Sequence, residues 1–137
     1  MELRLSQFIE MDQKHHNHYL LTHILLTHGH GDHVADALRI AKDKGVPVVC
    51  NYELSTIWAD ECEAIGFGKG GTLDLNGAKV TMVNATHSSS IELAGGVQYA
   101  GVEAGFMIAG EGHTVYLSGD TDIMADMEWM GDYHNPD

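Results

Sequence analysis

The stretch that decides the fold is Thr27-His28-Gly29-His30-Gly31-Asp32-His33. It follows a short apolar run, Ile24–Thr27, that is typical of a buried strand, and it precedes apolar residues at helical spacing. Side chains two positions apart on an extended backbone point to the same side. His28 and His30 can therefore bind one ion together.

Asp32 and His33 lie further along, at the start of the helix, where they can turn toward a second ion. The two intervening glycines let the backbone take dihedral angles that other residues resist, so the ligand side chains can converge. Imidazole favours Zn, and carboxylate adds tolerance for harder metals such as Mn or Fe. A lone loop histidine is usually solvated, but this cluster predicts a metal site made of His28, His30, Asp32 and His33.

The apolar pattern next predicts a strand, a helix and a second strand. The helix ends at Gly45, and the second strand is the apolar run Val46–Cys50. A crossover of this kind implies a parallel pair of strands. A second helix is expected to end near Gly66. The apolar positions of the two helices are Val34, Ala37, Leu38, Ala41, Leu54, Ile57, Trp58 and Ile65.

The second half of the chain predicts two β-hairpins and a last short helix. Thr72–Leu75 and Lys79–Val83 flank Asn76-Gly77, a dipeptide typical of a two-residue hairpin turn. Phe106–Ala109 and Thr114–Leu117 flank a glycine turn and form the second hairpin. One face of the last helix comprises Ile123, Met124, Met127 and Met130.

Composition and charge limit the classes of function. The 137 residues include 7 Lys+Arg against 20 Asp+Glu, so the formal net charge is −13. Nucleic acids and anionic membranes require a basic face, so we expect neither as a partner. Two cysteines give no disulfide framework, and no signal peptide or membrane span is evident, which favours the cytoplasm. We expect one α/β (α+β) domain over residues 1–137, with an atypical segment at 1–23.

Three motifs in the same order resemble those of a known family. His-x-His-x-Asp-His after an apolar strand is the signature of the metallo-β-lactamase superfamily of binuclear metal hydrolases. The chain resembles its branch of poorly characterised metal-dependent hydrolases, which share a Leu-Thr-His-Gly-His-Gly-Asp-His run. They also share Asn-Ala-x-His-Ser-Ser-Ser, here Asn84–Ser90, and a Ser/Ala-Gly-Asp-Thr segment, here Ser118–Thr121. The resemblance covers about Ile24 to the C-terminus.

The resemblance implies a partial αββα sandwich, two sheets packed face to face between outer helices. Relatives begin with strands and a Gly-His turn that residues 1–23 do not match. They also continue past the Gly-Asp-Thr segment to a last histidine that completes the second ion's ligands. We therefore expect a chain truncated at both ends, with the C-terminal part of the family fold missing. Exposed apolar sheet surface would then favour a homo-oligomer.

The resemblance also completes the set of ligands. It implies that His87 joins the first ion and that Asp120 bridges both ions. Taken alone, His87 is also compatible with an ordinary loop histidine and Asp120 with a helix N-cap. Ser88, Ser89 and Ser90 either hydrogen-bond the ligands or contact the substrate, or they form an ordinary polar loop. The full ligand set implied is His28, His30, Asp32, His33, His87 and Asp120.

One or two divalent ions, chiefly Zn with Mn or Fe as alternatives, are the cofactors implied, the first bound more tightly than the second. A metal-bound hydroxide would attack an ester, lactone, amide or phosphoester of a small-molecule substrate, and Asp32 would orient it and pass on its proton. One alternative is a catalytically impaired metal-binding fragment of such a hydrolase. A second alternative is an iron-dependent redox protein. Cys50, Cys62, His113 and His134 are not expected in the site.

Overall fold

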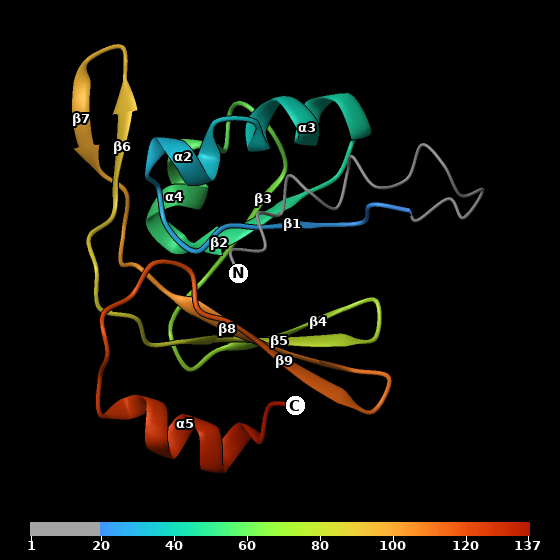
Figure 1. Ribbon diagram of the computed structural model, residues 1–137. Coiled ribbons are helices and arrows are strands. Elements are labelled where there is room, and N and C mark those ends of the chain that lie inside the picture. Colours follow the sequence, from blue (N-terminus) through green and yellow to red (C-terminus); the bar gives the residue numbers. More distant parts are fainter. Residues whose placement is uncertain (1–19) are drawn as a thin grey trace, which may run out of the picture.

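The computed structural model describes residues 20–137, so residues 1–19 of the atypical N-terminal segment lie outside it. The described chain forms four layers in the order helices, sheet, sheet, helix (Figure 1). Two sheets of three and four strands form the middle of the stack, and a separate two-stranded sheet completes the strands.

The first sheet is parallel and has the order β1-β2-β3. β1 (Ile24–Leu25) pairs with β2 (Val48–Asn51), which confirms the predicted parallel pair. β2 also pairs with β3 (Ala64–Phe67), a strand that the sequence did not predict. All four residues of β2 are buried because its two faces are both covered.

The predicted helices differ from the observed ones in two places. One predicted helix is split into α2 (Gly31–Val34) and α3 (Ala37–Lys44). The other, α4 (Tyr52–Ile57), ends early, so extending it to Ile65 was wrong. A short apolar run fits a buried strand and a helix segment equally well, and pairing with β2 decides for the strand.

The second sheet is antiparallel and has the order β4-β5-β8-β9. It contains both predicted hairpins, β4 (Thr72–Leu75) with β5 (Ala78–Val83), and β8 (Gly105–Gly110) with β9 (His113–Leu117). The first turn has φ of +57° at Asn76 and +94° at Gly77. Two positive φ values are what a twisted two-residue hairpin requires, so the Asn-Gly signal was right.

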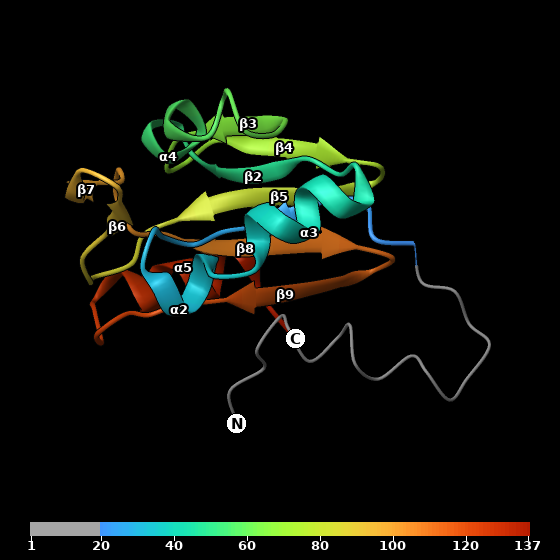
Figure 2. The ribbon, with the colours of Figure 1, turned by 90° about the horizontal axis from the view of Figure 1, so that it is seen from above.

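A third hairpin, β6 (Ser90–Leu93) with β7 (Gly96–Tyr99), was not predicted from the sequence. Both views place it at one edge of the body (Figures 1 and 2). Asn51 at the end of β2 anchors the chain that returns from it, because Asn51 Nδ2 donates to the carbonyls of Ala100 and Val102, each at 2.9 Å.

Three hydrophobic clusters hold the layers together. The first packs α3 and α4 on the first sheet through residues such as Ala41, Val48 and Leu54. The second lies between the sheets, where Leu25 contacts the cluster around Phe106. The third packs α5 (Asp126–His134) on the outer face of the second sheet through residues that include Val83, Met107, Met124, Met127 and Met130. This order of layers confirms the αββα fold class.

Helix α5 confirms the last predicted helix only in part. Met127 and Met130 lie on it and face the third cluster, and Met124 contacts that cluster from just before the helix. Ile123 was wrongly assigned to the apolar face, because it precedes the helix and is 85% exposed. Between residues 20 and 137, no helix has the length and apolar character needed to cross a membrane.

Candidate metal centre

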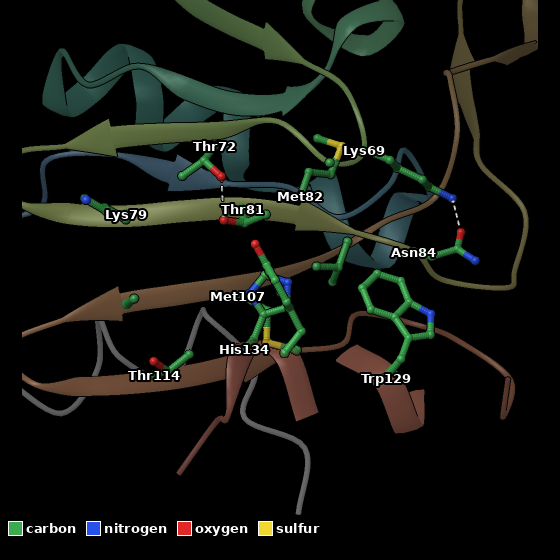
Figure 3. Close-up of a pocket in the computed structure, with 14 residues that line it drawn as sticks. Lys69, Thr72, Lys79, Thr81, Met82, Asn84, Met107, Thr114, Trp129 and His134 are labelled. Atoms are coloured by element: carbon green, nitrogen blue, oxygen red, sulfur yellow. Dashed lines mark hydrogen bonds between the residues drawn. The ribbon is translucent and has the colours of Figure 1, made fainter. Parts of the chain in front are cut away.

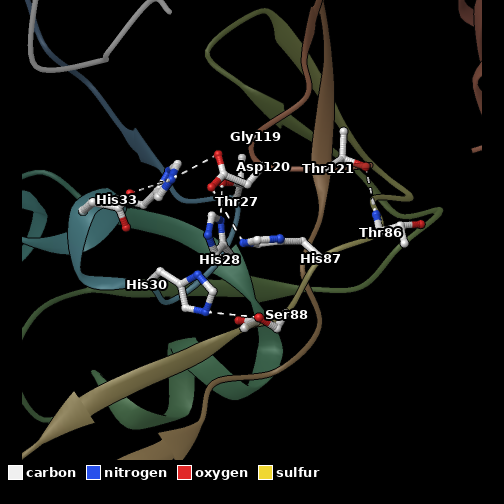
Figure 4. A network of polar contacts seen from close by, with 12 residues as sticks. Thr27, His28, His30, His33, Thr86, His87, Ser88, Gly119, Asp120 and Thr121 are labelled. Carbon is white, nitrogen blue, oxygen red and sulfur yellow. Dashed lines mark hydrogen bonds and ion pairs between the residues drawn. The ribbon is translucent and has the colours of Figure 1, made fainter. Parts of the chain in front are cut away.

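Three loops and the short helix α2 meet at one edge of the sandwich and carry the predicted ligands (Figure 4). The first follows β1, the second follows β5 and holds His87, and the third follows β9 and holds Asp120. β5 and β9 both run antiparallel to β8, so their C-terminal ends lie at the same end of the second sheet. Packing of the two sheets brings the loop after β1, with His28 and His30, to the same end.

The structure brings five of the six predicted ligands into two groups that share one residue. One group is His28, His30 and His87, and the other is His28, His33 and Asp120. Within each group the ligand atoms lie within 4.8 Å of one another. Asp32 belongs to neither group. Its side chain is 78% exposed, and its Oδ2 lies 3.7 Å from His33 Nε2.

His28 is the centre of the arrangement and is fully buried, with 0% exposed surface. Its Nδ1 lies 3.0 Å from Thr27 Oγ1, while its Nε2 has no hydrogen-bond partner in the described chain. Burial, followed by the charge of the neighbouring His33 and His30 rings, lowers the pKa of His28 to about 4. The ring is therefore neutral at pH 7.

That unpartnered nitrogen tests whether the residues fit a metal ion. A buried polar atom without a partner is costly, and a neutral imidazole with a free lone pair is a good ligand for a divalent cation. The other donors around it are imidazoles and one carboxylate, a set that suits Zn and tolerates Mn or Fe. The residues present fit an ion of this class.

Asp120 belongs to the second group and also approaches His87 of the first. Its Oδ1 is 3.3 Å from His33 Nε2, and its Oδ2 is 3.7 Å from His87 Nε2. The N-cap alternative for Asp120 is wrong, because α5 begins only at Asp126. Gly119 before it has a φ of +62°, a left-handed conformation that favours glycine at the exit from β9.

The serines after His87 contact the site in different ways. Ser88 Oγ lies 3.4 Å from His30 Nε2. Ser89 Oγ accepts a hydrogen bond from Gly29 N at 3.2 Å and donates to the Ala100 carbonyl at 3.3 Å. Ser89 therefore links the backbone between His28 and His30 to Ala100, which follows hairpin β6–β7. These contacts favour support of the ligands over an ordinary polar loop.

Two threonines that the sequence did not single out join the other two loops. Thr86 N donates to Thr121 Oγ1, and Asp122 N donates to the Thr86 carbonyl, each at 2.9 Å. These bonds hold His87 and Asp120 in a fixed relation. Only their position in the sequence could have indicated this role, because each threonine is adjacent to a predicted ligand.

Two cavities lie near or beside this centre. An open cleft of about 460 Å³ runs along the loops from Thr86 to His87 and from Gly119 to Asp122, so it reaches the predicted ligands. A larger cavity of about 660 Å³ lies between the second sheet and α5 (Figure 3). None of the six predicted ligands lines it, whereas His134 does.

Within residues 20–137, the two ligand groups do not include His113, His134, Cys50 or Cys62. His113 is exposed and its Nδ1 lies 3.2 Å from Asp137 Oδ2. Cys50 is buried in the first hydrophobic cluster, and Cys62 packs against it.

Comparison with known proteins supports the family indicated by the motifs. A family model described as "Beta-lactamase superfamily domain" matches residues 7–137, so the match begins before Ile24, where the sequence resemblance began. A UPF0173 metal-dependent hydrolase of Paracoccus denitrificans is 64% identical over 118 residues, which are 85% of this chain and 51% of the relative. A UPF0173 metal-dependent hydrolase of Cereibacter sphaeroides is 64% identical over 119 residues, with the same shares of both chains.

Solved structures give the same fold. Igni18, a metallo hydrolase from Ignicoccus hospitalis, is 28% identical with a TM-score of 0.74, over 87% of this chain and 50% of that one. A possible metal-dependent hydrolase from Veillonella parvula is 21% identical with a TM-score of 0.63, over 85% and 46%, a likeness of fold alone. The chain spans about half the length of the curated relatives it matches. It belongs to the metallo-β-lactamase superfamily, and the curated relatives that it matches within that superfamily are UPF0173 metal-dependent hydrolases.

Proposed function

We propose that the chain provides the metal centre of a hydrolase that cleaves an ester, lactone, amide or phosphoester bond in a small molecule. The observation that carries this proposal is the buried His28 Nε2, which has no partner in the described chain and is shared by both ligand groups. A structural histidine in a core normally has both ring nitrogens satisfied or exposed. An ion would satisfy this one.

The residues divide into roles by position. His28, His30 and His87 would hold the first ion, and Asp120 with His33 would extend the site toward a second. When bound, a zinc-type ion lowers the pKa of water toward neutrality and supplies the nucleophile for hydrolysis. Zn is the ion we propose first, with Mn or Fe as alternatives.

Asp32 is proposed as the residue that moves a proton. Its carboxylate is largely exposed at the rim of the site, close to His33, and lies in neither ligand group. An exposed carboxylate there can accept a proton at Oδ2 and pass it to solvent. The open cleft beside His87 and Asp122 would admit the substrate.

The experiment combines metal content with turnover. The purified chain is loaded with Zn or Mn, dialysed, and assayed for metal per chain and for hydrolysis of chromogenic esters and phosphodiesters. His28→Ala should abolish both tight metal binding and hydrolysis. His113→Ala, an exposed histidine outside both groups, is the matched control and should change neither. Turnover that survives His28→Ala would refute the proposal.

A second candidate is a metal-binding chain without turnover. The observation that favours it is the sharing of His28, because the two groups contain five side chains and cannot each hold an ion with three separate ligands. The same assay separates the candidates. A chain that retains one tightly bound ion after dialysis, yet hydrolyses no substrate above the rate of free metal, supports this second function.

A further inference from the structure

Thr27 precedes the first histidine, and its side chain lies beside both His28 and Gly119, the residue before Asp120 (Figure 4). It is buried, with 6% of its surface exposed. Its backbone is fixed by the Ala104 amide, which donates to the Thr27 carbonyl at 3.0 Å. Burial and this hydrogen bond leave Thr27 little room to shift.

The hydroxyl of Thr27 lies on one nitrogen of His28. Thr27 Oγ1 and His28 Nδ1 are 3.0 Å apart in a buried contact. A neutral imidazole carries one ring proton, and the partner of one nitrogen decides which nitrogen carries it. When the Nδ1–H of His28 donates to Thr27 Oγ1, the free lone pair is on Nε2, the atom without a partner.

The other side of Thr27 lies against the residue that precedes Asp120. A Cβ built on Gly119 would come within 2.7 Å of both Cβ and Oγ1 of Thr27, and within 2.8 Å of its Cγ2. The Thr27 side chain therefore occupies the space beside the Gly119 backbone. A shift of Thr27 would move the turn that presents the Asp120 carboxylate.

We propose that Thr27 is a positioning residue for the whole metal centre, setting the ring of His28 through its hydroxyl and the turn before Asp120 through its packing on Gly119. The inference rests on the proposed metal centre. Hydrogen bonds to the second nitrogen of a ligating histidine fix the ring's orientation and raise its basicity. His28 is common to both ligand groups, so a change at Thr27 should reach both.

The test uses the full chain and three substitutions. Thr27→Val removes the hydroxyl and keeps the branched shape, whereas Thr27→Ser keeps the hydroxyl and removes the methyl. Thr72→Val is the matched control, because Thr72 Oγ1 also makes one side-chain hydrogen bond, to Thr81 at 2.7 Å, on a strand of the second sheet. Zn²⁺ affinity is measured at neutral pH by competition with a chromophoric chelator. The tautomer of His28 in the metal-free chain is read by long-range ¹H–¹⁵N NMR.

We expect Thr27→Val to weaken Zn²⁺ binding by about 10- to 100-fold, with Thr27→Ser and Thr72→Val within about threefold of the unchanged chain. The unchanged chain and Thr27→Ser should show the Nδ1–H tautomer, and Thr27→Val a mixture. Wild-type affinity in Thr27→Val, or a loss in Thr27→Ser as large as in Thr27→Val, would overturn the role of the hydroxyl.

The two readouts separate this inference from the proposed function. If the unchanged chain binds no Zn²⁺, the proposed function fails, and the tautomer alone decides the role of Thr27. A pure Nδ1–H tautomer in metal-free Thr27→Val then overturns it. If the unchanged chain binds Zn²⁺ and Thr27→Val binds it equally well, only the positioning role fails.

Discussion

His33 Nε2 lies 3.3 Å from Asp120 Oδ1, a contact that joins α2, the helix after β1 of the first sheet, to the loop after β9 of the second sheet. The metal centre is therefore a junction between the two sheets. Unfolding that separates the sheets also separates the ligands. Ion binding and stability should be linked for this reason, because an ion that binds only the folded state stabilises it.

Zn²⁺ should raise the unfolding temperature of the chain. At a free concentration 100 times the dissociation constant, the expected stabilisation is about 2.7 kcal/mol. The measurement is a thermal melt with and without Zn²⁺, with a chelator added back to reverse the shift. An unfolding temperature that does not respond to Zn²⁺ would argue that the junction holds no ion.

Substitutions of single ligands should reduce metal binding to different extents, according to the group to which each ligand belongs. His28→Ala should remove all tight binding, because His28 belongs to both groups. His30→Ala should weaken binding of the first ion, and His33→Ala should weaken binding of the second ion only. Each loss of affinity should exceed the roughly 10- to 100-fold that is typical when a hydrogen-bond partner of a ligand is removed. Elemental analysis after dialysis reads the stoichiometry, and titration reads the affinities. Equal losses in all three variants would contradict the two-group arrangement.

Gly119→Ala should destabilise the chain more than a glycine substitution with the same backbone angle elsewhere. Gly45 has a φ of +64° and open space around it, whereas Gly119 has a φ of +62° and lies against Thr27. Alanine at either position costs about 1–2 kcal/mol, because a side chain disfavours the left-handed backbone conformation. Only Gly119→Ala adds a clash at 2.7 Å. Chemical denaturation of both variants measures the difference in the free energy of unfolding. Equal destabilisation would show that the Thr27 side chain moves aside at little cost.

The sequence predicted the elements whose signals are local. The Asn76-Gly77 turn and the His28–His33 motif each depend on residues that are adjacent in the chain. The parallel pair followed from the rule that a crossover connects parallel strands, and β1 with β2 confirms it. In each case short-range stereochemistry carries the information.

What the sequence did not predict depends on distant partners. Ile65 lies in a strand because β2 pairs with it, and nothing in its own neighbourhood distinguishes that outcome from a helix. Hairpin β6–β7 is held partly by Asn51, far away in the chain. The role of Thr27 needs the position of Gly119, which the sequence alone does not supply.

The two cysteines should differ in reactivity. Burial raises the pKa of Cys50 to about 12, and it also raises the pKa of the less buried Cys62. At pH 9 a thiol with a pKa near 12 is only about one part in a thousand thiolate, the form that reacts. Iodoacetamide should label Cys62 first in the native chain and both residues in denaturant. Peptide mapping by mass spectrometry checks the order, and early labelling of Cys50 would show that the first cluster opens readily.

The chain should self-associate through hairpin β6–β7. Val97 is 72% exposed and Tyr99 is 66% exposed, and they lie two apart on β7, so they face the same side. Within residues 20–137, β7 pairs with β6 alone, which leaves one edge open. The strand carries no charge, so a second copy of this strongly acidic chain can approach there with the least repulsion.

Light scattering at micromolar concentration should therefore report more than one chain per particle. The double variant Val97→Lys, Tyr99→Lys should shift the mass toward the monomer, because lysines on an exposed edge strand block pairing. Ile123→Lys is the control, since Ile123 is also exposed but lies before α5. A monodisperse monomer in the unchanged chain would refute self-association, and an oligomer that survives the double lysine change would move the interface away from β7.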